Sequence, residues 1–195
     1  MSIHLDESLR MKRMAKLVEG CQSVLDIGWA QSPNPFLLNE NVVGFDLNQR
    51  SLPRNYHESV AGDAHDMTHI FSGRRFDAIL AGEILEHVEQ PHAFLRSCRS
   101  LLSEKGRIVL STPNPNSPIE RLLTITLNRN YFYTTEHLCL YPQRWLIRMM
   151  ENSGFCDVEL HSGGFPVPFL GLIPFPRPWC HQTIAIAVKD SRDET

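Results

Sequence analysis

The fold is decided by the stretch Ser23–Asp46, SVLDIGWAQSPNPFLLNENVVGFD. Its two ends are typical of short apolar strands, because Ser23–Ile27 is ended by Gly28 and Val42–Phe45 is ended by Asp46. In open parallel α/β sheets, ligands bind at the carboxyl edge of the strands, where the connecting loops diverge. We therefore expect a nucleoside-type cofactor at this edge, with Gly28 approaching it closely and Asp46 accepting hydrogen bonds from the ribose hydroxyls.

The composition favours one compact domain that spans residues 1–195, with 42% hydrophobic and 21% charged residues in a chain of 195. A formal charge of -3 and a pI near 6.3 provide no basic footprint, so a nucleic-acid partner is disfavoured. No apolar run is long enough to span a membrane, and the N-terminal residues show no apolar leader. The five cysteines form no C-x-x-C pair, which argues against a disulfide framework and suits a reducing cytoplasm: Cys21, Cys98, Cys139, Cys156 and Cys180.

Strands and helices are expected to alternate along the chain. Further strands are predicted at 57–61, 76–81, 106–111, 155–160 and 183–188, and helical patterns at 6–19, from 82, from 91 and at 141–153. The first of these helices, within residues 1–20, is expected to cover the sheet. Such alternation predicts an α/β protein with a mostly parallel, doubly wound sheet.

The loop that follows the first strand is unusual. Pro33 and Pro35 prevent an immediate long helix. Gly28 is the only glycine of this loop, and Trp29 and Ala30 follow it. The G-x-G-x-x-G spacing that cradles a pyrophosphate is therefore absent, which argues against a nicotinamide dehydrogenase.

Seven blocks of sequence, taken in order, resemble the class I S-adenosylmethionine-dependent methyltransferases. They are VLDIG at 24–28, VVGFD at 42–46, GDAHD at 62–66, FDAILAGEILEHVEQP at 76–91, LLSEKGRIVLSTPN at 101–114, EHLCLY at 136–141 and ENSGF at 151–155. The chain is most similar to small O-methyltransferases of ubiquinone biosynthesis and of bacterial polysaccharide or natural-product clusters. The resemblance implies a Rossmann-like methyltransferase fold whose seven-stranded sheet ends in an antiparallel last strand.

The resemblance also implies S-adenosylmethionine as the cofactor. It places Asp63 and Ala64 at the adenine, with His65 or Met67 stacking on the ring. The alternative is that Asp46 and Asp63 are ordinary turn or cap residues. The full set of expected cofactor residues is Asp26, Gly28, Trp29, Ala30, Asp46, Leu47, Asp63, Ala64, His65 and Ala81.

A second group of polar residues follows the fourth strand, in the motif Glu83-Ile-Leu-Glu86-His87, and His137 comes later. On a helix, positions i, i+3 and i+4 share a face, so the side chains of the motif would converge. Two carboxylates and two imidazoles could bind Mg²⁺ or another divalent metal, which would lower the pKa of an acceptor oxygen. The pattern resembles the metal site of small-RNA 3′-terminal 2′-O-methyltransferases. Alternatively, His87, His137 or Glu83 acts directly in catalysis, or the two glutamates are first-turn acids stabilised by the helix dipole.

The sequence therefore predicts methyl transfer to an oxygen of a small, aromatic or lipophilic acceptor. The alternatives are a non-catalytic or regulatory protein that retains the fold, and methylation of an RNA 3′ end. The segments 112–140, including Tyr131–Tyr133, and 161–181 are expected to form acceptor-side loops, a lid or an interface. The proline-rich part of the second segment is a candidate homodimer contact.

Overall fold

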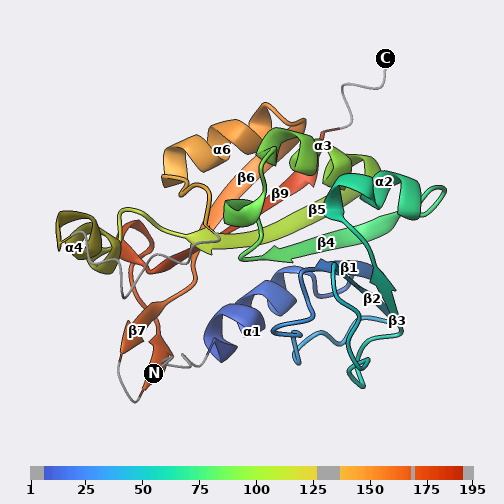
Figure 1. Ribbon diagram of the computed structural model, residues 1–195, viewed down its shortest axis with the longest axis horizontal. Helices are drawn as coiled ribbons and strands as arrows, with labels where there is room; N and C mark the ends of the chain where they lie inside the picture. Colours follow the sequence, from blue (N-terminus) through green and yellow to red (C-terminus); the bar gives the residue numbers. More distant parts are fainter. Residues whose placement is uncertain (1–6, 127–136, 168–169, 191–195) are drawn as a thin grey trace.

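The computed structural model describes residues 7–126, 137–167 and 170–190. Its seven-stranded sheet has the order β3-β2-β1-β4-β5-β9-β6 (Figure 1). The strands are β1 (Ser23–Ile27), β2 (Asn41–Asp46), β3 (Glu58–Ala61), β4 (Phe76–Gly82), β5 (Leu102–Pro113), β6 (Phe155–Ser162) and β9 (Gln182–Lys189). Strands β1 to β5 pair in parallel, whereas β9 runs antiparallel to both β5 and β6. The predicted fold class, with its antiparallel last strand, is confirmed.

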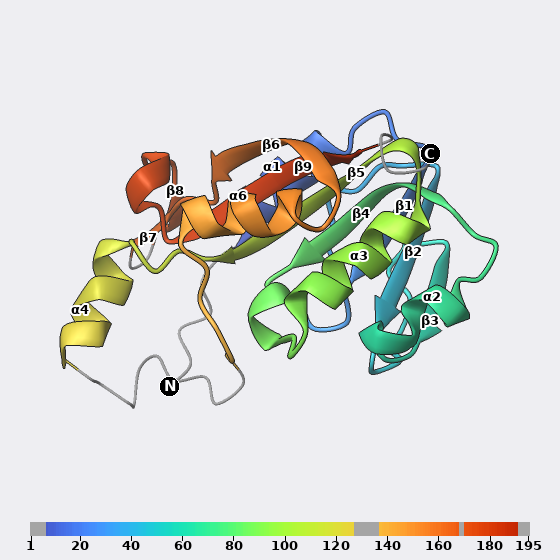
Figure 2. The same cartoon turned by 90° about the horizontal axis from the view of Figure 1, so that it is seen from above.

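Helices cover the two faces of the sheet unequally. Helices α3 (Pro91–Leu101) and α6 (Gln143–Glu151) lie on one face, and α1 (Ser8–Leu17) lies on the other (Figures 1 and 2). The face under α3 and α6 carries the larger buried cluster, and α1 closes a second cluster. The shorter elements are α2 (Met67–Ile70), α4 (Pro118–Thr126), the β7–β8 hairpin (Phe165–Val167 and Gly171–Ile173) and three 3-10 turns at 64–66, 85–87 and 177–179.

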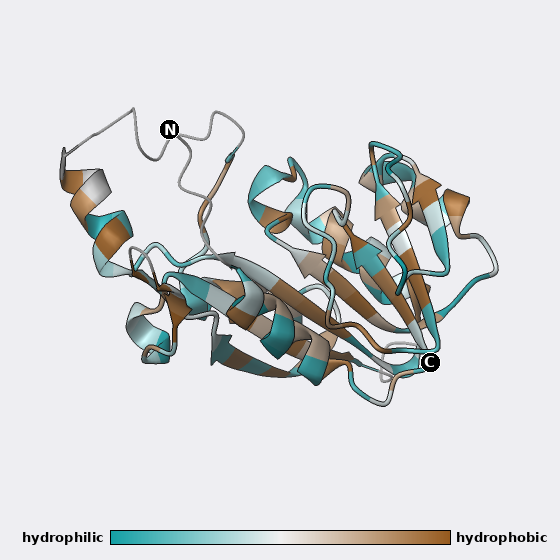
Figure 3. Cartoon of the chain, turned by 90° about the horizontal axis from the view of Figure 1, so that it is seen from below, coloured by the Kyte–Doolittle hydropathy of each residue, from teal (hydrophilic) through white to brown (hydrophobic). Residues whose placement is uncertain are grey.

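Helix α3 shows why these segments fold as they do. Pro91 occupies the start of the helix, where its missing N–H costs no hydrogen bond. Phe94, Leu95, Cys98 and Leu101 recur at helical spacing and are all buried against the sheet. In Figure 3 the strands are mainly hydrophobic, whereas the helices alternate between polar and apolar residues.

Three local expectations need correction. The segment after Gly82 is no α-helix: Glu83 has a left-handed φ of 54°, and only a 3-10 turn follows at Leu85–His87. Strand β5 begins at Leu102, directly after α3, and its pairing with β4 contains a register shift. The proline-rich segment pairs as the β7–β8 hairpin, since Pro166 lies on a two-stranded sheet whose ladder can spare an N–H.

The segments expected to form a lid or an interface lie beyond one end of the sheet. Helix α4 projects there, with Leu122 60% and Ile125 80% exposed (Figure 2). Residues 127–136, including Tyr131–Tyr133, lie outside the described part of the chain. Among the helices that are described, none has the length and hydropathy to cross a membrane.

Candidate active site

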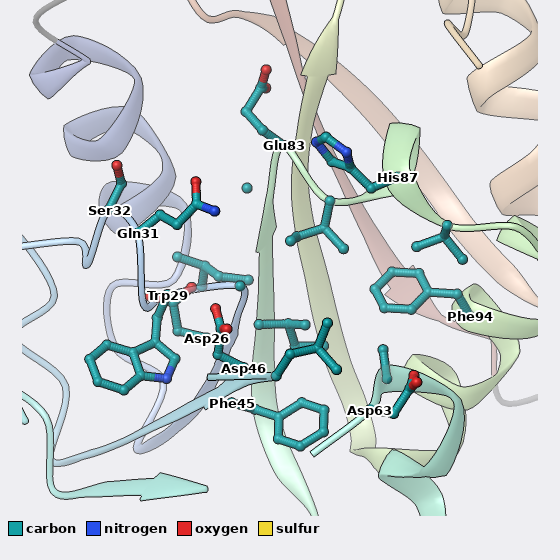
Figure 4. A pocket seen from close by; sticks show the side chains of 18 of the residues that line it. Asp26, Trp29, Gln31, Ser32, Phe45, Asp46, Asp63, Glu83, His87 and Phe94 are labelled. Carbon is teal, nitrogen blue, oxygen red and sulfur yellow. The ribbon is translucent and has the colours of Figure 1, made fainter. Parts of the chain in front are cut away.

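A cavity of about 600 Å³ opens at the carboxyl edge of β1, β2 and β4 (Figure 4). Helix α1 borders it on one side, and the turn at 64–66 with the start of α3 borders it on the other. Most of the predicted site residues line this cavity: Asp26, Gly28, Trp29, Asp46, Leu47, Asp63, Ala64, His65, Glu83 and His87. Ala30, Ala81, Glu86 and His137 are not among the lining residues.

Gly28 gives the cavity its close approach to the backbone. Its φ of 79° lies in the left-handed region that favours glycine. A Cβ at this position would lie 2.1 Å from Cδ1 of Ile84, so the strand-to-loop turn packs directly against the residue after Glu83. The Gly28 N–H donates to the Phe45 carbonyl at 2.8 Å, which ties the turn to the end of β2.

Asp46 is held in one orientation by backbone donors. Its Oδ2 accepts from the Ala30 N–H at 3.1 Å, and its Oδ1 accepts from the Asn48 N–H at 2.9 Å. Ala30 therefore acts on the site through its backbone, although its side chain is buried outside the cavity. A carboxylate at the end of the second strand, fixed in this way, has the position and charge for a ribose diol.

The Trp29 indole points away from the cavity. It is 2% exposed and packs in the cluster under α1, where its ring lies 5.4 Å from that of Tyr56. A Cβ on Gly44 would lie 2.6 Å from its Nε1, so the strand leaves room for the indole. The Trp29 side chain therefore supports the loop from the core under α1.

The turn after β3 forms the opposite wall. Asp63 Oδ1 accepts from the His65 N–H at 2.9 Å and lies 2.8 Å from His65 Nδ1. These hydrogen bonds lower the pKa of Asp63 and raise that of His65. Of the two candidates for stacking on an adenine, His65 lines the cavity, whereas Met67 is fully buried in the core. Ala81 is likewise buried in the main core, so its assignment to the cofactor stays a prediction.

Asp26 lies on the α1 side of the cavity. Its carboxylate accepts a short hydrogen bond from the Tyr56 hydroxyl. Burial raises the pKa of Asp26 to about 7, although the Tyr56 hydrogen bond and the Arg10 charge oppose the rise. A buried carboxyl with this pKa gains or loses its proton near neutral pH.

Arg10 is a site residue that the sequence reasoning missed. It is 4% exposed, lines the cavity, and donates from Nη1 to Ser111 Oγ at 2.8 Å. Ser111 in turn donates to Glu83 Oε1 at 2.9 Å. Burial lowers the pKa of Arg10, but the carboxylates of Glu83 and Glu7 outweigh it and raise the pKa overall. The sequence could have indicated that Arg10 is buried, because it lies one turn before Met14 on the apolar stripe of α1.

The predicted metal ligands divide into two groups. Glu86, His87 and His137 place one ligand atom each within 4.8 Å of one another, and the two imidazole rings are 4.8 Å apart. The Leu138 N–H donates to the Glu86 carbonyl at 2.7 Å, which brings the later segment alongside the motif. Glu83 lies outside this cluster, since its carboxylate is directed to Ser111 by the left-handed backbone.

Glu86 is the buried member of this cluster. It is 0% exposed, and its Oε2 accepts from the Thr112 hydroxyl at 3.1 Å. Within the described part of the chain, no hydrogen-bond donor reaches its Oε1. Burial, with the Glu83 charge, raises the pKa of Glu86 to about 8. A buried carboxylate oxygen beside two imidazoles is the arrangement that a cation would complete.

Comparison with known proteins identifies the family, because the methyltransferase domain family matches residues 9–160. The chain belongs to this family. The expected resemblance to class I S-adenosylmethionine-dependent methyltransferases is confirmed. The match contains the cavity lining from Arg10 on α1 to Ser97 on α3.

Individual relatives agree with this assignment. The ubiquinone biosynthesis O-methyltransferase of Roseobacter denitrificans is 36% identical over 156 residues, which are 73% of this chain and 58% of that protein. The chain thus spans little more than half of that relative's length, and about a third of the same enzyme from Cereibacter sphaeroides.

Solved structures share the fold. A methyltransferase from Archaeoglobus fulgidus has a TM-score of 0.72 at 20% identity and covers 93% of this chain and 92% of its own. A possible histamine N-methyltransferase from Thermotoga maritima has a TM-score of 0.72 at 13% identity, covering 94% and 89%. Because one of these neighbours is named a possible N-methyltransferase, the fold alone does not choose the acceptor atom.

Proposed function

We propose that this methyltransferase transfers the methyl group of S-adenosylmethionine to an oxygen of a small or lipophilic acceptor. One observation carries the proposal: the cavity brings together Gly28, Asp46 and Asp63 at the carboxyl edge of the sheet, with the Glu86, His87 and His137 cluster beside it. His87 belongs to both the cavity wall and the cluster, so the acceptor side adjoins the cofactor side.

The lining residues assign an orientation to the cofactor. Asp46 would hold the ribose hydroxyls, and the turn at 63–65 would hold the adenine. The amino-acid end would then lie on the α1 side, where Arg10 is a buried cation and Asp26 is a buried acid. The guanidinium Nε of Arg10 is buried and lacks a hydrogen-bond partner among the described residues, so it is a suitable donor to a carboxylate.

We also propose that Glu86, His87 and His137 hold a divalent cation. Two imidazoles with one carboxylate shift the preference from Mg²⁺, which favours oxygen ligands, toward Zn²⁺, Fe²⁺ or Mn²⁺. When bound, such an ion would supply a Lewis acid that lowers the pKa of an acceptor hydroxyl. The partnerless Oε1 of Glu86 is the structural feature that supports this assignment.

The remaining chemistry depends on positioning. Methyl transfer forms an O–CH₃ bond and breaks the S–CH₃ bond, and the acceptor oxygen loses a proton. Glu83 lines the cavity and burial raises its pKa, so it is a candidate to accept this proton. His87 is the candidate base if the cluster works without metal. The cavity walls align the oxygen, methyl and sulfur and exclude water.

The ubiquinone relatives support an O-methyltransferase, as their names state, but they do not name the acceptor of this chain. No lining residue of the cavity comes from the described parts of 112–140 or 161–181. Their role as acceptor-side walls, a lid or a homodimer contact therefore stays a prediction, as does the single-domain organisation of 1–195. The exposed Leu122 and Trp179 are compatible with a lipophilic acceptor or with a protein partner.

Titration calorimetry with S-adenosylmethionine and S-adenosylhomocysteine tests the proposal. We expect saturable binding of both, weakened by Asp46→Ala. If neither binds at millimolar concentration, the protein is the non-catalytic alternative. Trial acceptors that carry catechol, phenol or aliphatic hydroxyl groups, followed by mass spectrometry for a gain of one methyl group, then test the acceptor class.

A further inference from the structure

Tyr56 lies at the centre of a buried hydrogen-bond network on the α1 side of the cavity. It is 4% exposed and belongs to the connection between β2 and β3. Its hydroxyl oxygen accepts from the Asn34 N–H at 2.9 Å. Because that contact uses the oxygen, the hydroxyl proton is directed to Oδ2 of Asp26. Burial and the neighbouring Asp26 raise the pKa of Tyr56, so the phenol keeps its proton.

The same network anchors the loop after β1, in which Gly28 is the only glycine. The Asn34 side chain donates to the Met11 carbonyl of α1 at 2.9 Å and accepts from the Phe36 N–H at 3.0 Å. The Asn55 side chain donates to the carbonyls of Asn34 and Leu37 at 3.0 and 3.1 Å. Loop 29–37 is therefore fixed by side chains of the next connection, with Tyr56 as the link to Asp26.

The groups around Asp26 define what it can bind. Arg10 approaches it from α1, Asp46 from the end of β2 and Tyr56 from the β2–β3 connection, while its neighbour on β4 is the apolar Leu80. Arg10 forms an ion pair with Glu7 and also interacts electrostatically with Glu83, so its charge is shared between two acids. A carboxylate that faces a cavity with a second acid, Asp46, and one shared cation nearby is suited to a second cation.

We propose that Tyr56 is a positioning residue that presents Asp26 as the receptor for the ammonium group of the cofactor's amino-acid end. The inference rests on the proposed function, since it presupposes a cofactor with an amino-acid end. Tyr56, in the β2–β3 connection, thus orients the Asp26 carboxyl group from the far side of loop 29–37.

The geometry makes cofactor binding a proton-linked event. A cation beside Asp26 stabilises the carboxylate, so a proton held there passes to the solvent when the cofactor binds. Since burial raises the pKa of Asp26 to about 7, a part of the free molecules carries this proton near neutral pH. Binding near neutral pH then releases a fraction of a proton per site.

Calorimetry with S-adenosylhomocysteine in two buffers of different ionisation enthalpy counts the released protons. The comparison ligand is 5′-methylthioadenosine, which has the adenosine part but no amino-acid end. We expect proton release with S-adenosylhomocysteine only. In Tyr56→Phe, affinity for S-adenosylhomocysteine falls about tenfold, the effect of losing one hydrogen bond to a charged group, whereas affinity for methylthioadenosine is retained.

Two variants complete the design. Tyr141→Phe is the matched control, because its hydroxyl donates to the Leu85 carbonyl at 3.4 Å outside the cavity lining, and it should bind both ligands normally. Asp26→Asn should abolish proton release, and it decides the question if Tyr56→Phe does not fold. The proton count also distinguishes positioning from support of the fold, because loss of Tyr56 raises the pKa of Asp26 further and brings the release at pH 7 closer to one proton.

The outcomes are distinguishable. Failure of the unaltered protein to bind S-adenosylhomocysteine overturns the proposed function and this inference together. Binding with equal affinity and an equal proton count in Tyr56→Phe overturns the inference alone. Equal loss of both ligands in Tyr56→Phe also overturns it, because that result indicates a general effect on the loop.

Discussion

Replacing Gly28 by alanine tests the close approach on which the cavity depends. The change adds a Cβ at a φ of 79°, where an L side chain costs about 1 kcal/mol. The same Cβ would lie 2.1 Å from Cδ1 and 2.7 Å from Cγ1 of Ile84, and such overpacking costs a further ~2 kcal/mol. We expect Gly28→Ala to lower the free energy of unfolding by about 3 kcal/mol.

Gly73 provides a matched control. It has the same φ of 79°, but a Cβ there meets nothing within 4 Å. Gly73→Ala should therefore lose only about 1 kcal/mol, the conformational part. Urea unfolding of both variants, followed by circular dichroism, isolates the contact with Ile84, and the double variant Gly28→Ala with Ile84→Ala should recover most of the difference.

Ligand binding adds a second readout to this comparison. A methyl group in the turn displaces either Ile84 or the cofactor, so Gly28→Ala should weaken S-adenosylhomocysteine binding at least tenfold relative to Gly73→Ala. Equal stability and equal affinity of the two alanine variants would refute the close approach of this turn to the cavity.

Three other perturbations test the remaining parts of the site. Asp46→Ala removes the carboxylate that would accept two hydrogen bonds from the ribose hydroxyls, about 3 kcal/mol, so calorimetry should show roughly 100-fold weaker S-adenosylhomocysteine binding, whereas Asp66→Ala should have no effect. Because the pKa of Asp26 is raised from its ordinary 3.8 to about 7, its protonation stabilises the folded protein. This stabilisation is complete below pH 3.8 and is lost as pH rises through about 7. Asp26→Asn should flatten this part of the stability profile in thermal unfolding, and an unchanged profile contradicts the assignment. Glu86→Gln should abolish the binding of added Mn²⁺ or Zn²⁺ measured by elemental analysis, while the exposed Glu104→Gln retains it; metal binding that survives Glu86→Gln rules out the cluster.

The fold was largely predictable from sequence, because it depends on short-range patterns. Apolar runs ended by Gly28 and Asp46 locate the first two strands, and the helical spacing from Pro91 locates α3. The segment after Gly82 was misjudged for a definite reason. Its E-x-x-E-H spacing suits a helix, but the left-handed Glu83 interrupts it, and such a conformation is rarely signalled by a residue other than glycine, asparagine or aspartate.

The site was predictable in part. Asp46, Asp63 and His65 line the cavity as predicted, because they follow the ends of β2 and β3 and parallel strands bring their carboxyl ends to one edge. Trp29 lines the cavity as predicted, but the sequence did not show that its indole is buried in the core under α1, because neighbouring positions in a loop can face opposite sides. The cluster of Glu86 and His87 with His137 required the Leu138 contact, which no local pattern encodes.

The sequence by itself determined the family and most of the order of strands and helices, and it predicted the edge at which a cofactor would bind, since hydrophobic periodicity and turn residues act over a few neighbouring positions. Only the tertiary structure decided which polar side chains meet. Arg10 reaches Ser111 across 101 residues, and Tyr56 reaches Asp26 across 30. Such pairs depend on how α1 and the β2–β3 connection pack onto the sheet, and packing is a property of the whole core, not of any one segment.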